Sequence, residues 1–374
     1  MTGTPTVTAA WLVDKRAALQ VGPAPYTPPG EGEIVVANRA VAINPIDWIV
    51  PLLGRLAFPW IKLPFVLGAD LAGEVVEVGP GVTRFAVGDR VLGHAIGTDK
   101  KRNRSAEGAF QSHTVVLERL AAPIPDDLSY ERAAVLPLAL STAACGLFQT
   151  DQLALAHPSA APTPTGETLL VWGGATSVGS NAIQLAVAAG YDVVTTCSPR
   201  NDAYVEELGA SRSFDYRSPT VVADLTQALE GVMLAGAIAI GAGSGAPCAQ
   251  VVGACTGRRF VSMASPPVSF DQVSPQAGPR QLAPLVLRLV TSTIGLQVRT
   301  RTRRIRTKTI FGSSLAFNEV STAIYEDFLP QALADGRYRT APEPLVVGVG
   351  LESLQQGLDV HRAGVSAQKI VVTL

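Results

Sequence analysis

The chain has 374 residues, of which 47% are hydrophobic and 16% charged, and its formal net charge at neutral pH is −1. This length exceeds what a single hydrophobic core usually supports, so we expect two domains. The balanced charge gives no reason to expect a nucleic-acid partner. The four cysteines show no paired spacing and the N-terminus has no signal-peptide pattern, which predicts a cytoplasmic protein without a disulfide framework.

The first 120 residues or so predict a series of short strands. Residues 33–43 are rich in β-branched side chains, residues 72–79 alternate charged and apolar side chains, and a further strand candidate covers residues 88–93. Glycine and proline separate these segments. Closely spaced short strands of this kind are typical of a small β-barrel.

From about residue 125 the pattern changes to alternating helices and strands. A helix is predicted to begin after Ser129, a suitable N-cap, and to continue after Pro137 as far as Gln149. The proline-rich residues 157–166 predict an irregular loop. The later segments are expected as strands 168–172, 192–196 and 213–215 and helices 180–189 and 202–208. This alternation indicates a doubly wound parallel sheet, and residues 369–374 predict a final strand.

Residues 231–257 carry no charge and are long enough to raise the question of a membrane span. The segment contains seven glycines and Pro247, however. A buried strand, a glycine loop and a helix inside an α/β fold explain it better, because parallel strands covered on both faces are continuously apolar. We therefore expect no membrane partner.

Residues 266–309 form an unusually long passage between two such segments. Residues 281–290 predict an apolar helix, and a core position would account for Leu285, Leu289 and Val290. Six basic residues follow within ten positions: Arg299, Arg301, Arg303, Arg304, Arg306 and Lys308. They suit either an anionic partner, such as the acidic part of a substrate carrier, or a solvated edge strand, and we favour the edge strand. We expect the passage to shape the substrate entrance or a subunit contact.

The strongest signal for a binding site is a glycine turn between an apolar strand and a helix. Gly173, Gly174 and Gly179 lie in this turn. Glycine permits a tight turn and close approach of the backbone to a pyrophosphate, and the amides at the start of the helix face the anion. An ordinary strand–helix turn is the alternative, but the strand before and the helix after favour a dinucleotide cofactor.

The end of the next strand indicates which dinucleotide is bound. Folds that bind NAD place an acidic residue there to accept a hydrogen bond from the ribose. This chain has no acid at that strand end and instead has Ser198 and Arg200, which suit a 2′-phosphate. The alternative is a helix-capping serine beside an exposed arginine. We favour NADPH over NADH.

Together with the N-terminal half, these residues resemble the medium-chain dehydrogenase/reductase superfamily over nearly the whole chain. The match is to its quinone oxidoreductase and trans-acting enoyl reductase branch. The matching segments are 44–48, 67–75, 78–91, 141–142, 173–179, 214–216 and 365–371. The resemblance implies an α/β protein in which a GroES-like β-barrel catalytic domain (1–140 and 316–374) accompanies a Rossmann domain with a doubly wound parallel sheet (141–315).

The chain departs from the zinc alcohol dehydrogenases of that superfamily at the catalytic metal. Their Cys, His-Glu and Cys correspond here to Asn44, Ala69-Asp70 and Leu138. Zinc needs thiolate, imidazole or carboxylate donors, so we expect no metal there. Residues 94–113 also lack the cysteines of a structural zinc lobe. Without a Lewis acid, hydride addition to an activated C=C bond or a quinone is favoured over alcohol oxidation.

The resemblance also implies site residues. Those expected to contact NADPH are Gly174, Thr176, Ser177, Val178, Ser198, Arg200, Tyr216, Phe311, Gly312 and Lys369. Tyr216 could instead pack at a strand end, and Lys369 could be a surface charge. Thr142 is expected to position the nicotinamide, and Asn44 and Asp47 to orient the substrate. Asp47 could equally be a buried structural carboxylate, with water as the acid.

The expected activity is NADPH-dependent, zinc-independent reduction of a small apolar unsaturated carbonyl compound or quinone. Two alternatives are an enoyl reductase or reductive cyclase of a natural-product pathway, and a non-catalytic NADPH-binding protein. The resemblance is compatible with a homodimer.

Overall fold

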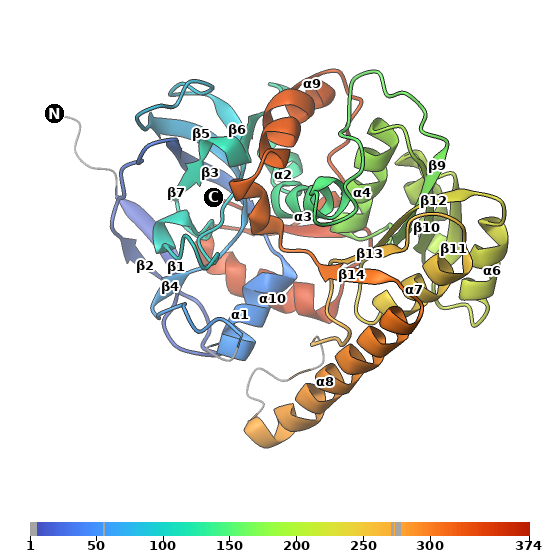
Figure 1. Cartoon of the computed structure of the whole chain (residues 1–374). Coiled ribbons are helices and arrows are strands. Elements are labelled where there is room, and N and C mark those ends of the chain that lie inside the picture. Colours follow the sequence, from blue (N-terminus) through green and yellow to red (C-terminus); the bar gives the residue numbers. More distant parts are fainter. Residues whose placement is uncertain (1–5, 55–56, 271–272, 274–277) are drawn as a thin grey trace. The chain divides into compact units, whose positions relative to one another are not determined.

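The computed structural model describes residues 6–54, 57–270, 273 and 278–374. The chain divides into two compact units: Met1–Leu138 with Tyr325–Leu374 form the first, and Ala139–Ile324 form the second. The chain therefore leaves the first unit, builds the second and returns (Figure 1). The domain boundaries expected from the sequence, after residues 140 and 315, stay a prediction.

The first unit is built on mostly antiparallel strands. Seven of them form one sheet in the order β15-β16-β3-β5-β6-β8, with β7 also paired to β3, and a smaller sheet has the order β2-β1-β4. The strands are β1 (Val7–Leu12), β2 (Gln20–Ala24), β3 (Glu33–Ala42), β4 (Phe65–Val66), β5 (Asp70–Val78), β6 (Arg90–His94), β7 (His113–Leu117), β8 (Ala121–Pro123), β15 (Glu343–Val349) and β16 (Gln368–Thr373). The predicted strands over 33–43, 72–79 and 88–93 are confirmed as β3, β5 and β6.

Short helices complete the first unit. They are α1 (Pro45–Leu53), α2 (Tyr130–Ala133), α9 (Leu329–Ala334) and α10 (Leu354–Ala363), with single turns at Ser105–Glu107, Glu118–Leu120 and Leu351–Ser353. The predicted N-cap at Ser129 is confirmed, because its side chain accepts a hydrogen bond from the Arg132 amide at 3.3 Å.

The second unit is a parallel sheet in the order β11-β10-β9-β12-β13-β14. Its strands are β9 (Glu167–Trp172), β10 (Asp192–Cys197), β11 (Arg212–Asp215), β12 (Met233–Ala239), β13 (Phe260–Met263) and β14 (Arg306–Thr309). The chain first moves outward from β9 to β11 and then returns to β12 on the other side of β9. This reversal, between β9 and β12, is where doubly wound sheets bind ligands, beyond the carboxyl ends of the strands.

Helices cover this sheet. They are α3 (Pro137–Phe148, beginning at the boundary between the units), α4 (Ser177–Ala188), α5 (Asp202–Glu207), α6 (Val221–Ala228), α7 (Gly245–Ala254) and α8 (Pro279–Thr302), with 3-10 turns at Pro199–Asn201 and Gly312–Phe317. A π-helix, Thr322–Phe328, leads the chain back into the first unit. Leu170, Leu225, Val251 and Val261 belong to one buried cluster between sheet and helices. The uncharged segment 231–257 is confirmed as a strand, a glycine loop and a helix, β12 and α7.

The passage 266–309 differs from its prediction. Its helix, α8, is longer than expected, and the core alternative does not hold: Val290 is 47% exposed, and Leu285 and Leu289 are only partly buried. A role at the substrate entrance or in a subunit contact stays a prediction. Periodicity shows that a helix has apolar faces but not that the fold covers them. Part of the passage, residues 271–272 and 274–277, lies outside the described residues.

The basic run occupies two kinds of structure. Arg299 and Arg301 lie in the last turn of α8, whereas Arg306 and Lys308 lie on β14. Because β14 ends the strand order of the parallel sheet, the edge-strand interpretation is confirmed for its part of the run.

Candidate active site

The glycine turn joins β9 to α4 and is packed too closely for other residues. Gly173 has a φ of 89°, which favours glycine. A Cβ atom on Gly179 would lie 2.2 Å from the Gly173 carbonyl oxygen, and one on Gly174 would lie 2.2 Å from the Thr195 hydroxyl. The chain therefore brings the start of α4 directly against the end of β9.

Neighbouring groups fix this turn and leave the start of α4 open to an anion. The amides of Gly173 and Gly174 donate to the hydroxyl and the carbonyl oxygen of Thr196, at 3.0 and 2.9 Å. Thr176 caps α4 by accepting from the Gly179 amide at 3.0 Å. The amides of the first helical residues, Ser177 and Val178, have no partner within the helix by its geometry. Such amides, together with the helix dipole, suit a pyrophosphate.

The predicted cofactor residues of β10 and β11 lie at the same sheet edge. Ser198 and Arg200 follow β10, which is the direct neighbour of β9, and Tyr216 follows β11. Ser198 is buried, Arg200 is exposed, and Tyr216 is 40% exposed with the Arg217 guanidinium over its ring. The structure thus brings these residues together with the glycine turn.

The first acidic residue that follows β10 in the chain is already engaged. Asp202, in the first turn of α5, accepts a hydrogen bond from the Ser213 hydroxyl at 2.8 Å and another from the Cys197 thiol. An exposed guanidinium on Arg200 and an occupied carboxylate on Asp202 fit a phosphorylated ribose better than a free one. The residues at this edge therefore fit NADPH.

The remaining predicted residues of the second unit lie near α3. Phe311 and Gly312 follow β14, and Phe311 is 69% exposed. The amide of Gln149 donates to Ser314 at 2.9 Å, which ties this segment to the end of α3. Thr142 lies on α3 and is partly buried. The exposed ring of Phe311 and the hydroxyl of Thr142 thus belong to two segments that are hydrogen-bonded to each other.

The first unit holds a separate buried polar cluster. Its members are Asn44, Asp47, Asp70, His94 and Lys369, each at most 3% exposed. The sheet register explains their proximity, because Ala42 of β3 lies opposite both Asp70 of β5 and Val371 of β16. Asn44 follows β3 directly and precedes α1, so three chain segments meet at one point.

Asp70 is the centre of this cluster. Its Oδ2 accepts from the Asn44 amide at 2.8 Å and lies 2.9 Å from the Lys369 ammonium. Its Oδ1 accepts from the Leu138 amide at 2.6 Å. The Lys369 ammonium also donates to Asn44 Oδ1 at 2.5 Å. Each side chain therefore fixes the orientation of the others.

Burial favours the uncharged form of both Asp47 and His94. Asp47 accepts hydrogen bonds from the amides of Asn44 at 2.8 Å and Gly68 at 3.2 Å. Burial raises the pKa of Asp47 to about 7; the Asn44 amide opposes this shift and the Asp70 charge adds to it. Burial also lowers the pKa of His94 to about 4. Asp47 can therefore hold or release a proton near neutral pH.

The residues at the position of the zinc do not fit a metal. An amide, Asn44, and an apolar residue, Leu138, replace two thiolates, and the Lys369 ammonium would repel a cation. Among the described residues, no three His, Cys, Asp or Glu side chains are placed to hold a metal ion. A positively charged side chain instead neutralises the carboxylate of Asp70.

The predicted site residues therefore form two groups, one in each unit. Asn44, Asp47 and Lys369 belong to the first unit, and the other predicted residues belong to the second. The surface-charge alternative for Lys369 is wrong, since this residue is 3% exposed; its contact with the cofactor stays a prediction. Sequence reasoning missed Asp70 as a centre and Thr196 as the anchor of the glycine turn. The sequence feature that could have pointed to Asp70 is its position in the segment that matches the His-Glu zinc ligands of the zinc alcohol dehydrogenases.

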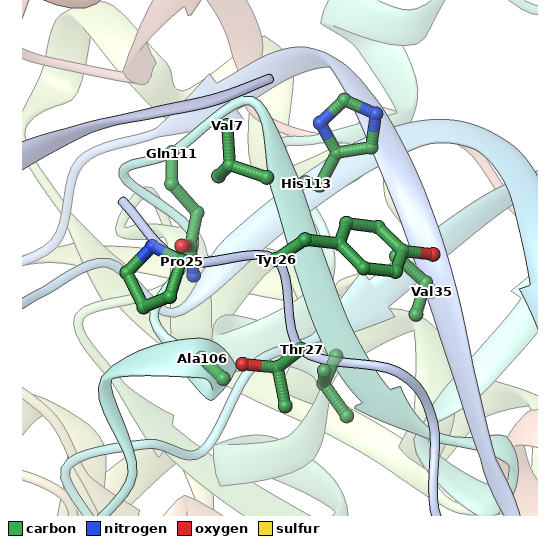
Figure 2. Close-up of a pocket in the computed structure, with 9 residues that line it drawn as sticks. Val7, Pro25, Tyr26, Thr27, Val35, Ala106, Gln111 and His113 are labelled. Atoms are coloured by element: carbon green, nitrogen blue, oxygen red, sulfur yellow. The ribbon is translucent and has the colours of Figure 1, made fainter. Parts of the chain in front are cut away.

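A small pocket in the first unit lies apart from both groups (Figure 2). Tyr26, Gln111 and His113 line it together with aliphatic side chains. The pocket has room for about one water molecule. It is too small for an organic substrate.

Comparison with known proteins agrees with this architecture. The alcohol dehydrogenase GroES-like domain model matches residues 30–126. The dehydrogenase pigH of Monascus ruber is 51% identical, covering 99% of this chain and 100% of that protein. The trans-enoyl reductase himH of Aspergillus japonicus is 38% identical, covering 98% and 97% of the two chains. The quinone oxidoreductase structure from Coxiella burnetii has a TM-score of 0.68 at 20% identity, covering 99% and 100%, and shows the shared fold.

The chain thus has the two-part fold of an oxidoreductase with a nicotinamide cofactor domain. It belongs to the medium-chain dehydrogenase/reductase superfamily and has dehydrogenases and a trans-enoyl reductase among its relatives, while quinone oxidoreductases share its fold.

Proposed function

We propose that the protein is an NADPH-dependent, zinc-independent reductase that adds hydride to an activated C=C bond or to a quinone. The observation that carries the proposal is the glycine turn at the reversal point of the parallel sheet, with Ser198 and Arg200 beside it. The trans-enoyl reductase among the relatives supports C=C reduction in particular.

The chain's own residues divide the work of binding. The first amides of α4 hold the pyrophosphate, and the Arg200 guanidinium holds the 2′-phosphate with a charge-assisted contact. Thr142 positions the nicotinamide ring, as the resemblance implies. Bound NADPH supplies the hydride. Orientation of the reactants and exclusion of water contribute much of the acceleration.

The first unit supplies groups for the substrate side. Hydride addition at the β-carbon of an unsaturated carbonyl compound moves an electron pair toward the carbonyl oxygen, and a proton must then be added. Asp47 can keep a proton available near neutral pH, because its pKa is about 7. Asn44, held by Asp70 and Lys369, is fixed in orientation. Bulk water is the other proton source.

The test is oxidation of NADPH by a panel of quinones, linear enones and α,β-unsaturated thioesters, followed by absorbance. We expect turnover with at least one of these classes and none with simple alcohols and NADP⁺. Tight NADPH binding without turnover of any acceptor would instead support a non-catalytic NADPH-binding protein. Turnover restricted to long polyunsaturated thioesters would identify a natural-product enoyl reductase.

A further inference from the structure

Helix α8 exposes a row of large apolar side chains. Its residues lie at spacings of three, four and seven, so they share one face. They are Val286 (43% exposed), Leu287 (64%), Val290 (47%), Ile294 (55%) and Val298 (55%). We call this row the α8 apolar face. Soluble proteins normally cover such a face, so something outside the described chain is expected against it.

The charged residues of α8 and of the chain segments next to it are all positive. Between Asp271 and Glu319 the sequence has no acidic residue. The basic residues in this interval are Arg280, Arg288, Arg299, Arg301, Arg303, Arg304, Arg306 and Lys308. Lys308 pairs with Asp151, but among the described residues no carboxylate pairs with the arginines of α8. A strong local positive charge therefore accompanies the apolar face in a chain of net charge −1.

The apolar face and the positive charge together favour one of three kinds of partner: a second copy of the chain, an acidic protein or an anionic lipid surface. A second copy of the chain would cover the apolar face but bring two strongly basic surfaces together, which like-charge repulsion opposes. An acidic protein would pair with the arginines, but its acidic side chains would not cover the apolar side chains of this face. An anionic lipid surface satisfies both features, because acyl chains accept the apolar side chains and headgroups accept the arginines.

We propose that α8 is an interfacial membrane-binding helix, which lies at the boundary between headgroups and acyl chains of an anionic bilayer. The expectation of no membrane partner came from residues 231–257, which are buried in the second unit; α8 gives separate grounds and leads to a different conclusion. The proposal is independent of the catalytic proposal above.

The connections of α8 favour lying on the bilayer over crossing it. Residues 280–302 have the length and mean hydropathy of a spanning helix, and only 6% of their most apolar 18-residue window is buried, whereas for the second stretch with these properties among the described residues, 130–148, 78% of the window is buried, as in a core helix. However, α8 connects β13 to β14, which are adjacent parallel strands of one sheet. The chain therefore enters α8 from and returns to the same sheet, which suits a helix lying along a bilayer better than one crossing it.

The proposal is tested by flotation of the full-length protein with two kinds of vesicle, phosphatidylcholine alone and phosphatidylcholine with phosphatidylserine. We expect binding to the second kind, weakened by added salt, and little to the first. Two variants separate the contributions: Leu287→Gln/Ile294→Gln/Val298→Gln removes apolar side chains, and Arg299→Gln/Arg301→Gln removes charge. Each should weaken binding about tenfold or more.

The matched control is Val87→Gln/Val346→Gln/Val349→Gln, which changes three exposed valines of the first unit. It should float like the wild type, and NADPH binding should be unchanged in all variants. Failure of the wild type to bind phosphatidylserine vesicles would overturn the proposal, as would equal loss in the control. A dimer in light scattering that the apolar variant dissociates, without vesicle binding, would assign the face to a second copy instead.

Discussion

At the scale of single residues, Asp70 determines how the polar cluster of the first unit is held together. Its carboxylate is fully buried and is contacted by Asn44, Leu138 and Lys369. A buried carboxylate that loses its cation becomes strongly unfavourable, whereas removal of both charges together is often nearly neutral. The Lys369–Asp70 pair is therefore expected to be coupled.

Lys369→Met should lower the apparent stability of the protein by roughly 3–5 kcal/mol, because Asp70 is left without its positive partner. Asp70→Asn combined with Lys369→Met should recover much of that loss. Thermal unfolding followed by circular dichroism measures both, with Lys62→Met, an exposed lysine of the same unit, as the control. If the double variant were no more stable than Lys369→Met alone, the residues would not act as a pair.

Arg200→Ala should weaken NADPH by about ten- to a hundredfold and leave NADH nearly unaffected, because it removes a charge-assisted phosphate contact. Fluorescence titration with both cofactors measures this. Arg258→Ala, an exposed arginine just before β13 at the opposite sheet edge, is the matched control. Equal weakening of both cofactors would show that Arg200 has a structural role instead.

Asp47 should make stability depend on pH in a defined direction. Its pKa is about 7 in the folded protein and 3.8 ordinarily, so between these values the unfolded chain is ionised while the folded protein keeps the proton. The Asp47 contribution therefore becomes less favourable as pH rises from about 4 to about 7, and is constant above that. Asp47→Asn removes this contribution.

Thermal midpoints of the wild type and of Asp47→Asn across this pH range test the sign. The midpoint of the variant relative to the wild type should rise with pH up to about 7 and then level off. A relative midpoint that falls over the same range would mean that Asp47 is ionised in the folded protein.

At the scale of secondary-structure elements, the turn from β9 to α4 depends on contacts that only glycine allows. Gly179→Ala would place a Cβ atom 2.2 Å from the Gly173 carbonyl oxygen, so the start of α4 must move. NADPH and NADH should be weakened alike, in contrast to Arg200→Ala, and titration with both distinguishes the two. Gly295→Ala, in open space on α8, should instead stabilise by about 0.5–1 kcal/mol.

The elements also show what a sequence can predict. The strand, the glycine turn and helix α4 are adjacent in the chain, so local pattern was sufficient to predict them. The Lys369–Asp70 pair depends on β16 and β5 flanking β3 in one register, which no local pattern encodes. The exposure of α8 could not be decided from the sequence for a similar reason, because which side of an apolar helix is covered depends on its neighbours in space.

At the scale of the whole molecule, the zinc-independent proposal predicts metal content. Elemental analysis of the purified protein should find zinc well below one equivalent, and chelators should leave activity unchanged. The reason is that Asn44 and Leu138 occupy positions that match zinc ligands, and that the Lys369 ammonium lies beside Asn44. Stoichiometric zinc lost together with activity on chelation would require a different reaction.

The discontinuity of the first unit has a consequence for how the protein is made. A ribosome completes β3 and β5 early, but β16, which pairs with β3 and carries Lys369, emerges only after the whole second unit. Until then residues 40–42 of β3 lack β16 as their partner, although β7 already pairs with residues 33–37, and Asp70 has no cation. The second unit, continuous in the chain, has meanwhile been fully synthesised and can fold first. The lysine that neutralises Asp70 is thus made after the second unit, so that a nascent chain cut short before it would keep both an unpaired end of β3 and an uncompensated buried carboxylate.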